Sequence, residues 1–359
     1  MTAGMDFLEQ VIFSLRSLYD RRGYSRYKMS KFEEYDLYAR NKDFLVDRSI
    51  ITFMDTNGRL MALKPDVTLS IVKNSRDEEN RLQKLYYNEN VYRVSNSTRQ
   101  FRELMQVGLE CLGPIDDYCI CEVLTLAAQS LGAISPDCVL DISHLGLLRQ
   151  ILAAVGLPPD REDVLQCISQ KNPHDLTALC TDCGISPEKA GILKEILSLR
   201  GTPAAVIPKL RDLLSGMIST EILDSLTRIT AALEAADIGS MIRLDFSVVD
   251  DIHYYNGIVF KGYIRGLPGS VLSGGQYDKL MEKMGRKSGA IGFAVYLDAL
   301  ERLDSRRPEY DVDTVLLYRE DTPLEAIQAR YLELTATGQS VLVQQQLPPN
   351  LRCRQIISM

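Results

Sequence analysis

Apolar residues recur at helical spacing at the start of the chain and predict a helix over residues 5–22. Gly23 follows the basic last turn of this helix, a position at which glycine commonly ends a helix. One side of the helix is expected to pack on a sheet, and that side is formed by Phe7, Val11, Ile12, Leu15 and Leu18.

A hairpin is predicted over residues 50–63, because two strand-like runs flank the turn sequence Thr56-Asn-Gly. Pro65 ends the second strand, and Asp66 stands at the junction with a following helix. The carboxylate of Asp66 can cap that helix. Ligands also often bind at such junctions, so the residues alone leave both roles for Asp66 open.

A strand over residues 101–113 follows a strand over residues 85–93, and one of its two sides is polar. Gln106, Gly108 and Glu110 share that side, which places an amide and a carboxylate about 13 Å apart with a glycine between them. Such a side can bind a cationic or imidazole-bearing small molecule, but a strand side that merely faces solvent has the same pattern. The opposite side is apolar and contains Met105, Val107, Leu109 and Cys111.

A helix over residues 116–131 and a strand over residues 138–142 lead into a long helical stretch, roughly residues 144–236. We interpret this stretch as an all-helical insertion in a sheet-centred core, since it contains no catalytic motif. Glycine and proline interrupt it, and its amphipathic segments cover residues 147–155, 161–170, 187–198, 205–217 and 220–235.

Residues 243–303 combine strand-like runs with a high density of glycine and tyrosine. Glycines let a backbone approach a ligand closely, and tyrosine hydroxyls can reach that ligand, so the block suits the floor of a binding pocket. A well-packed antiparallel sheet with tyrosines at its edge is the alternative interpretation. The predicted strands are residues 248–249, 258–264 and 270–272.

The end of the chain is predicted to be separate from this core. Residues 1–303 would form the core, and residues 304–311 would form a charged linker that contains Pro308. A short β-α-β tail is too small for an independent core, so it would have to dock elsewhere or be the remnant of a larger domain. Within this tail, residues 312–359, the pattern predicts a strand over 312–318, a helix over 324–337 and a strand over 340–344.

Composition narrows the class of protein. The chain has 359 residues, of which 45% are apolar and 25% are charged, as in globular proteins with a large core. The net charge of −7 and pI near 5.2 disfavour nucleic-acid binding, which needs a basic face. A charged amphipathic N-terminus and the lack of an apolar run of about 18 residues predict no membrane span and a cytoplasmic location.

Eight cysteines are scattered along the chain and are expected to be reduced in the cytoplasm. Cys180 and Cys183 form one CxxC pair, for which His174 is the only nearby candidate partner in a zinc site. The pair therefore favours two small side chains in a helical connection over a metal site.

Five segments, in the same order, resemble the catalytic core of class II aminoacyl-tRNA synthetases, specifically the histidyl-tRNA synthetase branch. The resemblance covers roughly residues 5–303, with residues 144–236 in the place of that family's insertion. It implies an α+β fold with an antiparallel sheet flanked by helices. The segments are Met61–Thr68, Tyr92-Arg93, Arg102–Glu110, Asp250–Phe260 and Gly274–Asp278.

This resemblance implies a pocket for histidine. Glu110 and Tyr255 would hold the imidazole, and Asp66 and Gln106 would lie near the amino group. The full set of ligand-binding residues that it implies is Asp66, Thr68, Arg93, Gln106, Glu110, Tyr254, Tyr255 and Tyr277.

Positions that handle phosphate in the synthetases differ in this chain. Asp250-Asp251 stands where the histidine-specific signature begins with arginine-glycine, and Ser95 replaces a glutamate of motif 2. Motif 3 reads glycine-phenylalanine-alanine-methionine-glycine-leucine-glutamate-arginine in the family and Gly292-Phe-Ala-Val-Tyr-Leu-Asp-Ala299 here. The two missing arginines would stabilise phosphate charge during adenylate formation, by several kcal/mol.

The pattern instead resembles the non-catalytic synthetase paralogue that is the regulatory subunit of short-form ATP phosphoribosyltransferase, the first enzyme of histidine biosynthesis. That resemblance implies a short catalytic subunit as partner, histidine as effector and a homodimer within a hetero-oligomer. It implies no catalytic residue, cofactor or metal. Two alternatives stay open: a divergent histidyl-tRNA synthetase that activates histidine with ATP, and a stand-alone histidine-binding or RNA-binding sensor.

Overall fold

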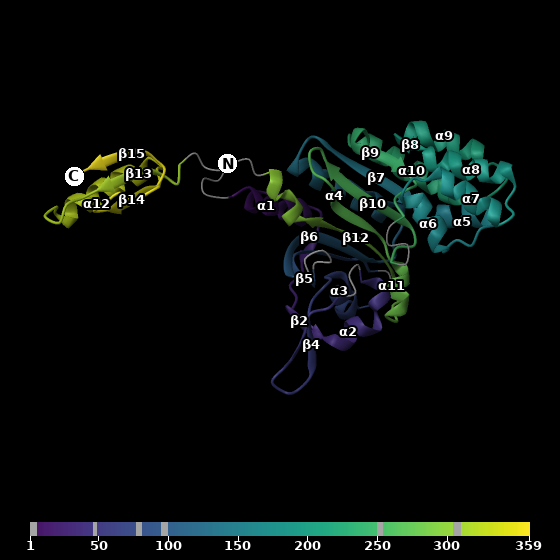
Figure 1. Ribbon diagram of the computed structural model, residues 1–359, viewed down its shortest axis with the longest axis horizontal. Helices are drawn as coiled ribbons and strands as arrows, with labels where there is room; N and C mark the ends of the chain where they lie inside the picture. The colour runs from purple at the N-terminus through teal and green to yellow at the C-terminus, as the bar shows by residue number, and fades with distance from the viewer. Residues whose placement is uncertain (1–5, 46–48, 77–80, 95–99, 250–253, 304–309) are drawn as a thin grey trace. The chain divides into compact units, whose positions relative to one another are not determined.

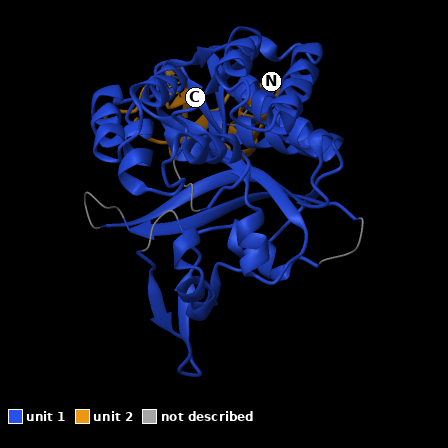
Figure 2. Cartoon of the chain, turned by 90° about the vertical axis from the view of Figure 1, so that its right-hand side faces the viewer, with its two compact units in different colours: residues 1–302 blue, residues 303–359 orange. Residues whose placement is uncertain are grey.

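The computed structural model describes residues 6–45, 49–76, 81–94, 100–249, 254–303 and 310–359. The chain divides into two compact units, residues 1–302 and residues 303–359, which Figure 2 shows in blue and orange. No helix within the described ranges is both long and apolar enough to cross a membrane.

The first unit is built around a nine-stranded sheet, which confirms the predicted α+β class. Its six central strands are antiparallel to their neighbours, whereas β1 joins β5 and β9 joins β7 in parallel. In spatial order the strands are β1 (Ser25–Arg26), β5 (Gln83–Val94), β6 (Phe101–Gly113), β12 (Gly289–Tyr296), β11 (Ser270–Gln276), β10 (Ile258–Ile264), β7 (Cys138–His144), β9 (Ile242–Asp245) and β8 (Arg200–Gly201).

Helices α1 (Phe7–Arg21) and α4 (Asp117–Ile134) pack on one face of this sheet (Figure 1). The predicted N-terminal helix is confirmed, and its Val11 and Leu15 are buried. Tyr19 lies edge-on to Phe293 of β12, with ring centroids 6.1 Å apart, and its hydroxyl is 2.9 Å from Ser130 Oγ of α4. This face of the sheet therefore carries a continuous apolar core.

The opposite face is covered by short elements and a small sheet. The predicted hairpin is confirmed: its two strands pair in antiparallel register, with Phe53 opposite Met61. These elements are the sheet β2 (Phe32–Glu34), β4 (Leu60–Leu63) and β3 (Thr52–Met54), with α2 (Tyr35–Arg40), η1 (Lys42–Phe44), α3 (Thr68–Asn74) and α11 (Asp278–Lys283).

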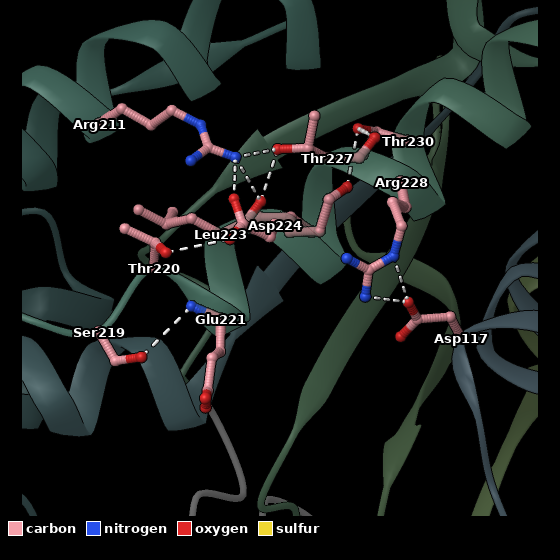
Figure 3. A network of polar contacts seen from close by, with 11 residues as sticks. Asp117, Arg211, Ser219, Thr220, Glu221, Leu223, Asp224, Thr227, Arg228 and Thr230 are labelled. Atoms are coloured by element: carbon pink, nitrogen blue, oxygen red, sulfur yellow. Dashed lines mark hydrogen bonds and ion pairs between the residues drawn. The ribbon is translucent and has the colours of Figure 1, made fainter.

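The predicted helical stretch is helical apart from β8. Arg228 of α10 donates to Asp117 at the start of α4 at 2.6 Å, and Arg211 of α9 donates to Asp224 of α10 at 2.7 Å, so α10 is tied to both helices (Figure 3). The helices are α5 (Leu145–Val155), α6 (Glu162–Ser169), α7 (Pro173–Asp182), α8 (Pro187–Ser198), α9 (Pro203–Leu213), α10 (Glu221–Ala235) and η2 (Gly239–Met241).

One predicted strand, residues 248–249, is wrong. The strand at this place is β9, which ends at Asp245, and the chain then turns because the Asp245 carboxylate accepts bonds from the amide and hydroxyl of Ser247, at 3.0 and 2.6 Å. Val248 and Val249 are buried beyond that turn. Their apolar character reflects burial rather than strand pairing.

The second unit contains the predicted β-α-β arrangement and one further strand. Its three strands are parallel, and Val315 and Leu316 of the central strand are fully buried. The additional strand was not predicted, since polar residues separate its apolar ones. The elements are β13 (Val312–Leu317), α12 (Leu324–Ala336), β14 (Val341–Gln344) and β15 (Cys353–Ser358), and η3 (Leu297–Leu303) precedes them.

Packing of α4 on the sheet predicts a cost for one added methyl group. A Cβ at Gly262 of β10 would lie 2.7 Å from Leu131 Cδ1 and 3.0 Å from Leu272 Cβ. Gly262→Ala should therefore lower the free energy of unfolding by about 1–3 kcal/mol in urea titrations. The matched change Gly132→Ala is on the exposed side of α4, where the atom nearest to the new Cβ is 3.7 Å away. This change should raise the free energy of unfolding by about 0.5–1 kcal/mol. Equal stability of the two variants would contradict this packing.

Candidate functional site

A cavity of about 50 Å³ lies on the sheet face opposite α1 and α4. Its walls come from β5, β6, β11 and β12, from the start of α3, and from Tyr254, Tyr255 and Tyr277. All eight residues predicted to bind a ligand line this one cavity: Asp66, Thr68, Arg93, Gln106, Glu110, Tyr254, Tyr255 and Tyr277. Asp250, Asp251 and His253 lie outside the described residues, as does Ser95.

Strand register explains how these side chains fit. Glu110 of β6 is paired with Gly292 of β12, and a Cβ at Gly292 would overlap the Glu110 carboxylate. Gly108 is paired with Tyr87 of β5, and a Cβ there would overlap the phenol of Tyr87. Each large side chain therefore lies flat over a glycine of the neighbouring strand.

Glu110 occupies the buried end of the cavity and is only 2% exposed. Thr68 Oγ1 donates to Glu110 Oε1 at 2.7 Å, and the Tyr277 hydroxyl donates to Oε2 at 2.6 Å. Burial raises the pKa of Glu110 to about 8, although both hydrogen bonds oppose that shift. The carboxyl group is thus held in one orientation and is close to changing charge at neutral pH.

Asp66 performs the predicted capping role and also lines the cavity. Its Oδ1 accepts from the backbone amide of Leu69 at 2.8 Å, within the first turn of α3. Burial raises the pKa of Asp66, and the nearby Arg93 guanidinium opposes that rise. Arg93 Nε in turn donates to the carbonyl of Pro65 at 3.2 Å. A cation and a carboxylate therefore stand together at this end.

Three tyrosines form an aromatic wall. The rings of Tyr254 and Tyr255 meet edge to face at 4.7 Å, and those of Tyr254 and Tyr277 are 5.7 Å apart. Burial raises the pKa of Tyr277 well above its usual value, so its phenol stays protonated and donates to Glu110. The wall offers apolar surface and hydroxyl groups to a flat ligand.

The two ends of the cavity differ in depth and chemistry. Glu110, Thr68 and Tyr277 are buried, whereas Asp66 and Arg93 are half-buried. The Glu110 carboxyl group beside aromatic rings suits the imidazole of a ligand. At the other end, the Asp66 carboxylate suits a ligand's ammonium group, and the Arg93 guanidinium suits its carboxylate. The arrangement thus matches the two ends of an amino acid with a basic ring.

Several lining residues were not among those predicted. The polar side of β6 and the glycines of β12 indicated the position of the floor, but not which neighbours would lie over it. The additional residues include Tyr87, Ser273, Ala294 and Tyr296. Ala299, at the position of the motif 3 arginine, lies in η3 and does not line this cavity.

The CxxC pair lies at the end of a helix, as the prediction of a helical connection requires. Cys180 is buried in α7, and the Cys183 thiol accepts a hydrogen bond from Arg161 at 2.7 Å. Among the described residues, no group of three or more histidine, cysteine, aspartate or glutamate side chains is placed to hold a metal ion.

A family model described as histidyl-tRNA synthetase matches residues 4–300 of the chain. One relative, named ATP phosphoribosyltransferase regulatory subunit, from Alkaliphilus metalliredigens, is 29% identical over 289 residues, covering 79% of this chain and 73% of the relative. Another, named histidine–tRNA ligase, from Methanocaldococcus jannaschii, is 28% identical over 291 residues, covering 80% and 69%.

Solved structures share the fold. An ATP phosphoribosyltransferase regulatory subunit/histidyl-tRNA synthetase from Bacillus halodurans aligns with a TM-score of 0.81 at 23% identity, covering 98% of this chain and 93% of that one. The ATP phosphoribosyl transferase (HisG:HisZ) complex from Thermotoga maritima aligns with a TM-score of 0.63 at 21% identity, covering 82% and 98%. These similarities confirm the predicted class II synthetase-like fold.

The raised pKa of Glu110 predicts a pH-dependent stability of the unliganded chain. An acid that binds its proton more tightly in the folded state contributes stability at low pH, and that contribution is lost as pH rises from about 4.5 to about 8. The shift of Asp66 acts in the same direction. The free energy of unfolding should therefore decrease less between about pH 5 and about pH 9 in Glu110→Gln than in the wild type, with a difference of a few kcal/mol at most.

Urea titrations across this pH range measure the slope, and Glu103 provides a control. Glu103 is exposed on the same strand, and hydrogen bonds from Asn90 and Tyr92 lower its pKa, so it is ionised throughout the range. Glu103→Gln should leave the slope unchanged. Parallel curves for the wild type and Glu110→Gln would contradict the assignment.

Proposed function

The chain belongs to the histidyl-tRNA synthetase family, and we propose that it serves as a non-catalytic regulatory subunit of ATP phosphoribosyltransferase in histidine biosynthesis. One observation carries this proposal: a single cavity contains every side chain expected to hold histidine, while two positions expected to stabilise phosphate carry Asp250 and Ala299. Relatives with the name of such a subunit support the same conclusion.

Loss of the two cations argues against adenylate formation. Attack of a carboxylate on ATP concentrates negative charge at the transferred phosphate, and enzymes stabilise it with fixed cations. Asp250 would repel that charge, and the alanine side chain at position 299 has no charge. Binding of histidine needs neither group, so the chain can keep affinity for the amino acid without activating it.

We propose that histidine is the effector bound in the cavity. Its imidazole would lie between Glu110 and Tyr255, with Tyr277 closing the buried end. Its amino group would lie near Asp66 and Gln106, and its carboxylate near Arg93. Thr68 fixes the Glu110 carboxylate, and Tyr254 packs between the other two tyrosines, so both act through their neighbours.

A cytoplasmic hetero-oligomer is the proposed working form. The complex from Thermotoga maritima supports a short catalytic subunit of ATP phosphoribosyltransferase as the partner. A homodimer of this chain within that assembly is supported by apolar side chains on the small sheet and α1. Phe13, Phe32, Phe53 and Met54 are 64%, 48%, 38% and 61% exposed.

Calorimetric titration of the chain with histidine tests the effector site. Glu110→Gln and Tyr277→Phe each remove one partner of the buried hydrogen bond between these side chains, so each should weaken histidine binding at least about tenfold. Glu103→Gln should bind like the wild type, because Glu103 lies on the exposed part of the same strand. Absence of histidine binding, alone and in complex with the catalytic subunit, would refute the effector assignment.

Activity assays separate the regulatory function from that of a synthetase. The catalytic subunit should need this chain for full ATP phosphoribosyltransferase activity, and histidine should inhibit the complex but not a complex containing Glu110→Gln. Histidine-dependent exchange of pyrophosphate into ATP by the chain alone would instead identify a divergent synthetase. A catalytic subunit whose activity ignores this chain would reject the proposed partnership.

A further inference from the structure

Four residues of β12 line the cavity, and the three at alternate positions, which share one side of the strand, differ sharply in size. Gly292 lies opposite Glu110, Ala294 opposite Gly108, and Tyr296 opposite Gln106. Gly292 and Ala294 have little or no side chain, whereas Tyr296 places an aromatic ring at the end of the cavity beside Gln106. That end is about 13 Å from Glu110 along the strands, since four residues separate Gln106 from Glu110.

Tyr296 belongs to the less buried part of the cavity lining. It is half-buried, unlike Glu110 and Tyr277, and it lines the cavity together with the half-buried Arg93 and Ser273. Tyr87 of β5 also lines the cavity. The Tyr87 ring covers Gly108 of β6 from β5, and Tyr296 stands on β12 at the other side of β6, so aromatic residues of both neighbouring strands line this part of the cavity.

We propose that Tyr296 is a specificity-determining residue that restricts the cavity to a free amino acid and excludes ligands with a bulky group on the α-carboxyl. This inference rests on the proposed histidine site. With the imidazole at Glu110, the α-carbon end of the ligand lies toward Gln106, and Tyr296 stands directly opposite Gln106 in the register of β12 and β6, so a bulky group on the carboxyl carbon would meet the Tyr296 ring. The synthetase motif 3 pattern has glycine at this position, whereas this chain has a tyrosine.

The exclusion is steric, which separates it from the charge changes at positions 250 and 299. A missing cation weakens the binding of a phosphate but leaves an uncharged substituent unaffected. The Tyr296 ring hinders a phosphate and an uncharged bulky substituent alike. An uncharged, bulky derivative of histidine therefore reports on Tyr296 alone.

Two derivatives form a matched pair of probes: histidine methyl ester and histidine 2-naphthylamide. Both lose the carboxylate charge, so the ratio of their affinities measures the space available beyond the carboxyl carbon. Calorimetric titration of the full chain should give methyl-ester binding at least about tenfold tighter than naphthylamide binding for the wild type. Tyr296→Phe keeps the ring and should keep that ratio.

Tyr296→Gly should bring the ratio to within about threefold of unity while histidine affinity changes by less than about threefold. Tyr296→Ala provides a second truncated variant with the same expectation if the glycine weakens β12, and thermal melting shows whether either variant is folded. Retention of the wild-type ratio by both truncated variants, or tight binding of the naphthylamide by the wild type, overturns the proposal.

The outcomes also separate this proposal from the proposed function. If all variants bind histidine and the ratio never changes, Tyr296 does not set specificity and the histidine site stands. If no variant binds histidine or its methyl ester, the histidine site and this inference fall together.

Discussion

The cavity depends on one buried carboxyl group, that of Glu110, and on the two hydroxyls that bind it. Thr68 and Tyr277 reach it from the start of α3 and from the residue before α11, segments 42 and 167 residues away in the chain. These two hydrogen bonds fix the covering elements against the sheet at one point. The glycine at position 292 leaves the space in which the carboxyl group lies. The strand register, the covering helices and the shape of the cavity therefore meet at the same contact.

A group buried in this way reduces stability, so its retention points to ligand binding. Among the described residues, Glu110 forms no ion pair with a lysine, arginine or histidine, and burial favours its neutral form. An incoming imidazole supplies a hydrogen-bond donor or a positive charge to a carboxyl group that the protein leaves without a cation. The proposed ligand site therefore contains a buried carboxyl group with a raised pKa, as is common for functional sites.

The sequence predicted this arrangement unevenly. Alternation along β6 identified Gln106, Gly108 and Glu110 as one side of a strand, because a period of two is visible in any single strand. Which strands lie beside β6 depends on pairing between distant segments, so Tyr87 and Tyr296 were not identified as lining residues. Val248 and Val249 were misassigned for a related reason: an apolar pair shows burial, and the turn at Asp245 is formed by a side-chain hydrogen bond that periodicity does not contain. Family resemblance located the eight cavity residues, since it carries information on pairing that periodicity lacks.

Regulation places different demands on this cavity from those of catalysis. A catalyst must bind the transition state more tightly than the substrate, which in a synthetase requires cations at the phosphate. An effector site must bind its ligand more tightly in one conformation of the assembly than in another. The cavity is suited to the second task, because Asp66 at the cap of α3, Glu110 on the sheet and Tyr277 before α11 belong to separate elements. A ligand that contacts all three elements is sensitive to their relative positions, so small movements of the covering elements change its affinity. By linkage, binding of the ligand also shifts the equilibrium between those positions.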